Sequence, residues 1–395
     1  MAATLEHHYA YAAPSALGDD GLALATSGRA APFFRGWVER PAARAAAMLA
    51  VARVSRARYD LPDLSRLADP VVGCAPEAVR FEALSSCAGV YGRLDLDVAE
   101  LDGEVARPGT TNVDFNAEMR AQLAKVGDVS PLHVEVGAEA VTVTSERGAV
   151  VERKVALPVR WVKGFGEAGV AQSRLEPRLE LSGPVAGRFI RALPKGSLAV
   201  YHVSQVRRDA WIGTTPKPGS LALAGPERLR LLEPLMRHAR RLRAWGDDSG
   251  VSAWALDLPG ARLHVVLSPD IWRGFSGEGQ VLEELAAGDP ALAARGLAGF
   301  DLDAGDFYAR ELPYDLAKVE ELHPRLVDAR RLVDAGAVRR GVPGEAWVEG
   351  STGVEHRVRL ADSACTCPWW ARHAGARGPC KHVLAARMAL EGDDE

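Results

Sequence analysis

The sequence predicts an α+β protein, in which a mixed helical and antiparallel β body precedes a small ββα unit at the C-terminus. Three features predict this class: stretches that alternate apolar and polar residues, separate stretches with helical periodicity, and a cysteine cluster in the last tenth of the chain. The chain has 395 residues, of which 47% are hydrophobic and 25% are charged. That length and composition are ordinary for a globular protein and suffice for more than one buried core.

Antiparallel β-structure is expected in three regions. Residues 132–158 are typical of a meander, because Gly137 and the segment 145–148 supply turns between alternating stretches. The segment RWVKGFGEAG that follows is expected to fold back over this meander. A second β-rich region spans 196–224, and a hairpin is expected to turn at 259–260, where Pro and Gly are adjacent.

Helical periodicity marks three further segments. Pro41 suits the first turn of a helix that runs to about residue 58. The segment 226–245 is expected to form one long helix with leucines on its buried face. A third helix is expected within 323–341, with Gly336 near its C-terminal cap.

Three arginines on the second of these helices are spaced to share one face. Arg230, Arg237 and Arg241 follow each other at intervals of seven and four residues. Such a basic stripe can contact phosphates. The alternative is that the arginines cover a solvated surface, as they often do on long helices.

Composition and charge exclude several classes of protein. The formal net charge is −4, so nucleic-acid binding would need a local basic patch. The chain has no run of about 18 apolar residues, and its N-terminal segment lacks the pattern of a secretory signal. Five cysteines, three of them clustered, argue against a disulfide scaffold. We therefore expect a cytoplasmic protein that does not contact a membrane.

The cysteine cluster has the spacing of a metal site. Cys365 and Cys367 are separated by one residue, Cys380 and His382 are separated by one residue, and twelve residues lie between the two pairs. Zn²⁺ prefers four thiolate or imidazole ligands at the corners of a tetrahedron. These four residues are the predicted ligands of one structural Zn²⁺, and His373 in the spacer is the alternative histidine ligand.

The residues around the ligands predict the ββα unit. The stretches EAWVEG and EHRVRLAD alternate apolar and polar residues on either side of STG, which indicates a hairpin. Gly378 and Pro379 suit the start of a helix over KHVLAARMAL, with His382 in its first turn. The competing interpretation is that the cysteines are buried apolar residues and the histidine is incidental.

A site with four protein ligands leaves no open coordination position, so the expected role of the metal is structural. A ββα unit of this size has too small a core to fold alone. Zinc binding is therefore expected to supply much of its stability.

Basic and aromatic side chains flank the predicted site. Residues 351–390 hold six Lys or Arg and two Asp or Glu. Arginines beside tryptophans can bind a nucleic-acid backbone and stack a base. Alternatively, one tryptophan packs under the metal site and the arginines are solvated. The candidates for partner or nucleic-acid binding are Trp369, Trp370, Arg372, Arg377 and Lys381.

The sequence offers no persuasive catalytic set. Cys87 lies in the turn-rich string SSCAGVYG and would be a nucleophile only beside a histidine base, which the sequence does not identify. The loop GFSGEGQVLEELA does not have the spacing of a phosphate-binding loop. We therefore expect that the protein is not an enzyme.

The ligand pattern and several other segments resemble bacterial SWIM zinc-finger family proteins. The finger of that family has the pattern Cys-x-Cys, a variable spacer and Cys-x-His, which the four predicted ligands match in order. The other segments that carry the resemblance are FFRGW, SSCAGVYGRLD, GTTNVDFN, ERKVALPVRWVKGF, RGFSGEGQVL, ARELPYD and CTCPWW.

The resemblance implies partners that the residues alone do not. Family members are usually encoded near MoxR-type AAA+ ATPases and von Willebrand A domain proteins, which implies a component of an ATPase-driven assembly. SWIM fingers are credited with DNA binding or protein binding, so the resemblance does not decide between them.

These observations give one expected function and two alternatives. The expected function is a protein-interaction adaptor in a MoxR and von Willebrand A type ATPase system. The alternatives are DNA binding through the basic face of the finger, and an enzyme within the central region. The predicted regions are an N-terminal α+β region at 1–125, a central β-rich region with one long helix at 126–285, a helical connector at 286–340 and the SWIM-type zinc finger at 341–395.

Overall fold

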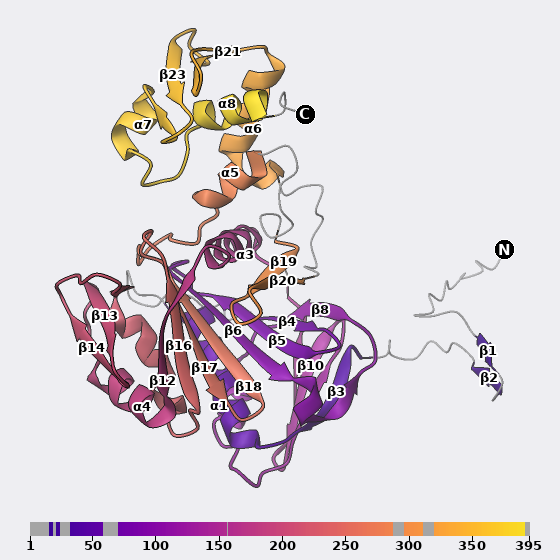
Figure 1. Ribbon diagram of the computed structural model, residues 1–395. Coiled ribbons are helices and arrows are strands. Elements are labelled where there is room, and N and C mark those ends of the chain that lie inside the picture. The colour runs from indigo at the N-terminus through magenta and orange to yellow at the C-terminus, as the bar shows by residue number, and fades with distance from the viewer. Residues whose placement is uncertain are drawn as a thin grey trace, which may run out of the picture.

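The structure, a computed structural model, describes residues 16–18, 21–23, 32–57, 70–155, 157–286, 296–310 and 320–391. Helices and antiparallel sheets combine within these residues, so the predicted α+β class is confirmed. Figure 1 shows a large β-rich body and a smaller C-terminal unit, with α5 and α6 between them. Part of the ARELPYD segment lies outside the described residues.

The body is organised around an eight-stranded antiparallel sheet of order β12-β16-β17-β18-β6-β5-β4-β8 among the described residues. Its strands β6 and β18 pair in the middle, with Leu94 opposite Leu263. Strands from both sides of residue 125 therefore share one sheet. The strands are β4 (Val71–Cys74), β5 (Ala78–Leu84), β6 (Val90–Asp97), β8 (Gly109–Asn112), β12 (Glu176–Ser182), β16 (Arg241–Gly246), β17 (Ser252–Leu258) and β18 (Ala261–Leu267).

Two helices contact the middle of this sheet. Helix α1 (Pro41–Arg56) begins at the predicted proline and packs on β5 and β6, and α3 (Val159–Gln172) contacts β5. All residues of β5 are buried. Gly92 permits the close approach of α1, because a Cβ atom there would lie 3.0 Å from a methyl carbon of Val54.

A second sheet of the body contains the predicted meander. Its order is β11-β10-β9-β3-β7, and β9, β10 and β11 pair in sequence as expected for residues 132–158. Helix α2 (Ala117–Leu123) lies against β11, with Asn116 as its N-cap. The strands are β3 (Phe34–Val38), β7 (Leu101–Val105), β9 (Leu132–Val136), β10 (Ala140–Ser145) and β11 (Gly148–Arg153).

The predicted β-structure at 196–224 and the turn at 259–260 are also confirmed. The first forms a sheet of order β14-β13-β15, and the second joins β17 to β18 with Gly260 at a φ of 64°. The strands and the adjacent helix are β13 (Val200–Val206), β14 (Asp209–Gly213), β15 (Leu221–Ala224) and α4 (Gly183–Ala192).

The prediction of one long helix over 226–245 is wrong. Residues Pro226–Leu235 form a 3₁₀ helix, η2, and strand β16 follows at Arg241–Gly246. Pro234 lies inside the predicted helix, where it lacks the amide hydrogen that an α-helical bond needs.

Because that helix does not form, the basic stripe predicted on it does not form either. Arg230 on η2 donates to Glu233 at 2.5 Å, and Arg241 on β16 donates to Asp257 at 2.7 Å. The Nε of Arg237 lies 2.9 Å from the Nε2 of His238. The three arginines thus lie on different elements.

The C-terminal unit contains a sheet of order β21-β22-β23-β24 against helix α8. The hairpin predicted around STG is the β22–β23 pair. Helix α6 lies beside α8 and ends before Gly336, which has a φ of 66° as expected for a cap. Helix α6 spans Pro324–Asp334, and the elements of the unit are β21 (Val338–Arg340), β22 (Glu345–Glu349), β23 (Glu355–Arg359), β24 (Ala364–Cys365), α7 (Pro368–His373) and α8 (Lys381–Glu391).

The remaining elements are short. Helix α5 (Gln280–Ala286) follows the glycine-rich loop and packs against α3 and α8. The others are β1 (Ala16–Gly18), β2 (Gly21–Ala23), η1 (Val98–Glu100), β19 (Ala298–Asp301), β20 (Asp306–Ala309) and η4 (Glu320–Leu322). In the described part of the chain, no helix combines the length and apolar character needed to span a membrane.

Candidate metal centre

The three clustered cysteines and His382 come together at the meeting point of three elements. Cys365 ends β24, Cys367 is the N-cap of α7, and Cys380 directly precedes α8, which carries His382 in its first turn. All four side chains are buried, with exposed fractions between 1% and 6%. Their ligand atoms lie within 4.8 Å of one another.

This arrangement fits one tetrahedral Zn²⁺. The Nδ1 of His382 is 3.9 Å from the Sγ of Cys365 and 4.0 Å from the Sγ of Cys380. Around zinc, bond lengths of about 2.3 Å to sulfur and 2.0 Å to nitrogen put these atoms roughly 3.6 Å apart. The four groups therefore need to move only slightly to ligate one ion.

The electrostatics of the cluster also favour a cation. Hydrogen bonds among the three thiols raise the pKa of Cys365 and lower that of Cys367, and the pKa of Cys380 is raised to about 11. In this buried cluster the charge of one thiolate disfavours a second. Zn²⁺ would supply the positive charge that permits three thiolates.

The outer side of His382 faces another histidine. Its Nε2 is buried without a hydrogen-bond partner, and the ring of His356 on β23 lies 4.5 Å away between centroids. Nδ1 is the ring nitrogen that faces the sulfurs of Cys365 and Cys380, so it is the atom placed to bind the metal. His373, the alternative ligand, packs instead on Trp369 with ring centroids 4.4 Å apart.

Residues 348–388 match the family model of the SWIM zinc finger. These residues form a SWIM zinc finger. Cys365, Cys367, Cys380 and His382 are its metal-binding cluster, which is suited to one zinc ion.

Outside the finger, the similarity of the chain to known proteins is limited. No curated protein matches the chain. Among solved structures, proliferating cellular nuclear antigen from Entamoeba histolytica is similar with 9% identity and a TM-score of 0.42, covering 60% of this chain and 99% of that one. The PCNA2–PCNA3 complex from Sulfolobus tokodaii is similar with 10% identity and a TM-score of 0.44, at the same coverage.

The two tryptophans of the SWIM finger are partly buried and have partners. The Nε1 of Trp370 donates to the backbone oxygen of Ser363 at 2.9 Å. The ring of Trp369 lies 5.0 Å from the guanidinium carbon of Arg325 on α6. Both pack against the core of the finger, so this geometry fits the interpretation in which tryptophans support the metal site.

Most of the basic side chains around the finger are engaged. Arg357 pairs with Glu345 and Arg359 pairs with Asp362, while Lys381 donates to the hydroxyl of Ser351 at 3.3 Å. By contrast, Arg372 and Arg377 are exposed, and neither side chain has a partner among the described residues. The predicted basic face is therefore reduced to the spacer between the two ligand pairs.

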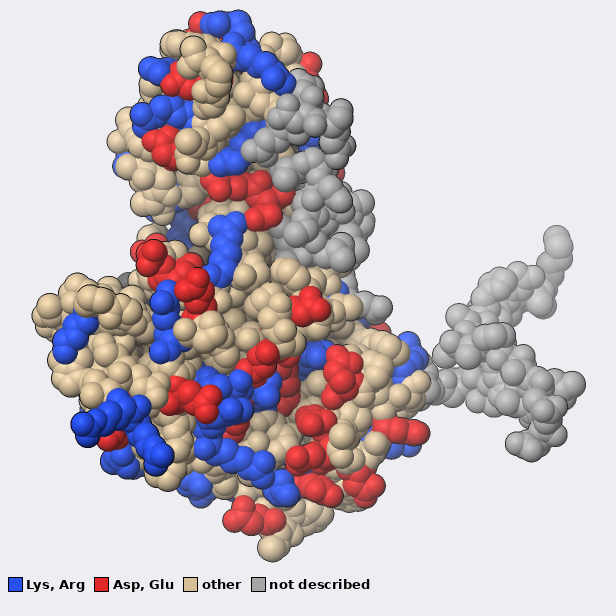
Figure 2. Space-filling view, viewed as in Figure 1, with Lys and Arg blue, Asp and Glu red and all other residues tan. Residues whose placement is uncertain are grey.

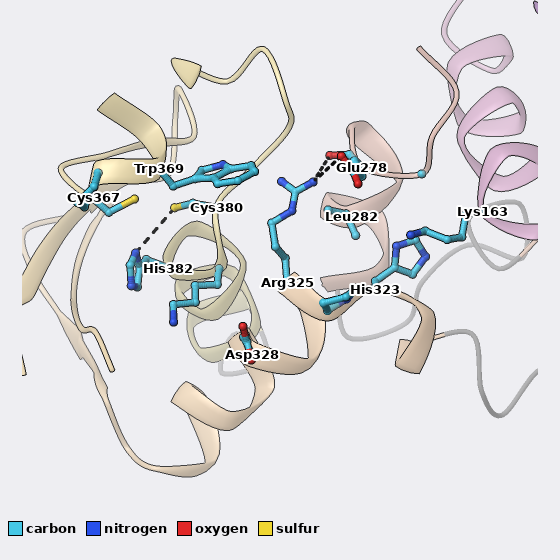
Figure 3. Close-up of a pocket in the computed structure, with 14 residues that line it drawn as sticks. Lys163, Glu278, Leu282, His323, Arg325, Asp328, Cys367, Trp369, Cys380 and His382 are labelled. Atoms are coloured by element: carbon cyan, nitrogen blue, oxygen red, sulfur yellow. Dashed lines mark hydrogen bonds and ion pairs between the residues drawn. The ribbon is translucent and has the colours of Figure 1, made fainter. Parts of the chain in front are cut away.

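A cavity of about 440 Å³ lies between the finger and the body (Figure 3). Arg325 crosses it and donates to the backbone oxygens of Arg377 at 2.8 Å, Pro379 at 2.6 Å and Glu278 at 3.0 Å. One guanidinium thus joins α6 to the spacer of the finger and to a loop of the body.

Glu167 holds a second contact in the region where the finger meets the body, which we call the joint. From α3 it accepts the amide hydrogens of Gly279 at 3.1 Å and Gln280 at 2.9 Å at the start of α5. Burial raises the pKa of this carboxyl to about 7, although the backbone donors oppose the shift. Sequence reasoning missed both Glu167 and Arg325, because their partners are backbone groups distant in sequence.

Proposed function

We propose that the protein is a non-enzymatic adaptor in which the SWIM finger is a docking surface for a partner protein. The observation that carries the proposal is the charge pairing on the finger strands, where Arg339, Arg357 and Arg359 already contact carboxylates. A surface neutralised in this way suits a protein partner better than a polyanion. The closed zinc site supports a structural role for the metal.

A buried polar cluster in the body, centred on Glu82, supports a structural function as well. Glu82 is 2% exposed and accepts hydrogen bonds from Tyr91 at 2.5 Å and from Arg310 at 3.0 Å. Burial raises the pKa of Glu82, but Arg310 more than offsets this and holds it below its usual value. Such a satisfied pair joins β5 to the segment after β20, and ion-pair networks of this kind perturb pKa values without catalysis.

Cys87 is equally unsuited to catalysis. It is 3% exposed, and its Sγ lies 3.4 Å from the hydroxyl of Ser85. A buried thiol beside a hydroxyl lacks the base that activates a nucleophile.

The partner system rests on the family resemblance. Bacterial proteins of the SWIM zinc-finger family are usually encoded near MoxR-type AAA+ ATPases and von Willebrand A domain proteins. We therefore propose a partner of one of these two kinds, in the cytoplasm.

The test is affinity capture of the tagged full chain from its own host, with and without nuclease, followed by mass spectrometry. Proteins retained after nuclease treatment, an AAA+ ATPase above all, are expected. Capture that depends wholly on nucleic acid would contradict the adaptor function.

DNA binding through the finger is the second candidate, because Arg372 and Arg377 are exposed without carboxylate partners among the described residues. Phosphate contacts predict an affinity that falls steeply as the salt concentration rises. Charge reversal at these two arginines should then abolish binding to DNA. A salt-independent affinity would exclude this candidate.

A further inference from the structure

A cleft separates the spacer of the finger from a loop of the body. Its volume is about 350 Å³, and residues 270–279 of the body and 372–378 of the finger line it. The two segments touch at Gly378, which has a φ of 70°, and a Cβ atom there would lie 1.9 Å from the backbone oxygen of Glu278. Neither the finger nor the body alone contains this cleft.

Positive charge gathers on both walls. Arg372 and Arg377 enter from the finger as exposed side chains without an ion-pair partner in the described ranges. Arg273 enters from the body, with a side chain 45% exposed. Arg372 and Arg377 are thus available to an anion, and Arg273 is half exposed beside them.

Two carboxylates also line the cleft, but one is already engaged. Glu278 lies 3.7 Å from Arg273 and 3.8 Å from Arg325, so two cations share it. Asp270 is the other lining carboxylate. The cleft therefore keeps an excess of positive charge in a chain whose net charge is −4.

An exposed aromatic ring lies beside these charges. Trp272 lines the cleft and is 51% exposed, and the guanidinium carbon of Arg273 lies 5.3 Å from its ring centroid. Arg273 has a φ of 63°, a conformation that non-glycine residues rarely adopt. Hydrogen bonds from Arg273 and Phe275 to the backbone of residues 87 and 88 hold this loop. The structure thus maintains a tryptophan and an arginine at the mouth of the cleft.

We propose that this cleft binds an acidic segment of a partner protein, with carboxylates on Arg273, Arg372 and Arg377 and an apolar side chain on Trp272. The proposal rests on the adaptor function and names the chemistry of its partner. Guanidinium groups bind carboxylates through paired hydrogen bonds, and tryptophan and arginine are the residues that most often anchor protein interfaces.

The dimensions and charge of the site favour a peptide over a nucleic acid. A cleft of about 350 Å³ accommodates a few side chains. The face visible in Figure 2 carries both signs of charge interspersed, on the body and on the finger. A nucleic acid needs a continuous basic track for successive phosphates, whereas the carboxylates of Asp270 and Glu278 lie among the arginines of this cleft.

The experiment measures binding of a fluorescein-labelled peptide of Asp and Glu with one central Phe to the zinc-loaded full chain, by fluorescence anisotropy. The same peptide with Asn and Gln in place of the acids is the charge control. Labelled oligodeoxythymidylate is the nucleic-acid probe. We expect binding of the acidic peptide alone, weakened by added salt.

Substitutions in the cleft test whether the acidic peptide binds there. The double variant Arg372→Glu with Arg377→Glu should weaken peptide binding by roughly tenfold or more, because it places like charges against the carboxylates. Trp272→Ala should weaken it less. The matched control is Arg147→Glu with Arg208→Glu, which changes the net charge equally at exposed turns of the body. Zinc content should equal that of the parent chain in every variant.

Three results would overturn the proposal: no binding of the acidic peptide, equal loss in the control variant, or binding of the oligonucleotide in preference to the peptide. Failure of the adaptor function appears differently, as the absence of nuclease-resistant partners in the capture experiment. If partners are captured equally by the Arg372→Glu and Arg377→Glu variant, the adaptor function stands and the cleft is not its site.

Discussion

The body and the SWIM finger bury very different cores. In the body, helix α1, strand β5 and the middle of the eight-stranded sheet belong to one continuous cluster of buried apolar side chains. The finger has a much smaller cluster, and three of its members are the zinc-ligating cysteines. That cluster is completed from outside the finger by Val170 of α3, by residues 281–286 of α5 and by Leu326 and Ala329 of α6.

The difference teaches what each part needs in order to stay folded. The body has a large continuous apolar core, and burial of such surface is the dominant stabilising term in folding. The finger depends on two further contributions, the metal and the contacts with α5 and α6. Its position relative to the body is therefore set by groups that are neither in the body core nor among the zinc ligands, above all Arg325 and Glu167.

Loss of zinc should have the largest effect on the difference in stability between the finger and the body. Cys380→Ser removes one ligand, and zinc binding in such sites contributes on the order of 10 kcal/mol. The finger should unfold while the body keeps its structure, and bound zinc should fall below one ion per chain. Metal analysis and hydrogen exchange check both expectations.

The control for that variant is Cys74→Ala, which removes a buried thiol of β4 outside the cluster. It should retain zinc fully. Full zinc retention in Cys380→Ser would contradict the ligand assignment.

Removal of the Arg325 side chain should have the next largest effect. Arg325→Ala leaves the carbonyl groups of Glu278, Arg377 and Pro379 without their shared donor. Hydrogen bonds to a charged group contribute about 1.5 to 3 kcal/mol each. Loss of the three bonds should therefore weaken the contact between the finger and the body by roughly 4.5 kcal/mol or more. Hydrogen exchange should accelerate in α8 and remain slow in β17.

Arg325→Lys is the informative companion variant. An ammonium group keeps the charge but cannot reproduce the planar set of donors, so it should restore only part of the protection. Complete restoration would show that charge alone holds the joint.

Glu167 should make the joint sensitive to pH. Its pKa is raised by burial to about 7, above the usual value of 4.5, so the protonated form is favoured in the folded protein. Its contribution is fully present below pH 4.5 and is lost as the pH rises through about 7. The loss amounts to at most about 3 kcal/mol.

Glu167→Gln keeps an acceptor for the amides of α5 and removes the titration. Thermal unfolding of the zinc-loaded proteins should show the parent chain losing stability relative to the variant between about pH 4.5 and about pH 7. Parallel curves for the two proteins would argue against a protonated Glu167.

The smallest effect is expected on the exposed face of the finger strands. Arg357→Ala breaks an exposed ion pair with Glu345, and exposed pairs contribute little to stability. Zinc content and the unfolding temperature should be unchanged, and peptide binding at the cleft should be unchanged as well. A loss of partner capture in this variant would move the docking surface from the cleft to the strands.

Sequence reasoning succeeded where the pattern was local. Period-two alternation predicted the β9–β11 meander, and Pro41 and Gly336 marked the correct ends of α1 and α6. It failed over 226–245, where apolar spacing suggested a helix but Pro234 and pairing with β12 and β17 produced a 3₁₀ helix and a strand. It also left the RWVKGFGEAG segment without a helix, although α3 begins at Val159.

The sequence by itself determined the metal site of this protein, because the two pairs of ligands are each separated by one residue and their geometry follows from short-range backbone structure. Only the tertiary structure decided which of the surrounding charges are free. Arg357 and Arg359 find carboxylates on or beside neighbouring strands, whereas Arg372 and Arg377 face a loop a hundred residues earlier in the chain. Pairing between residues distant in sequence depends on how the finger lies against the body, and no local pattern encodes it.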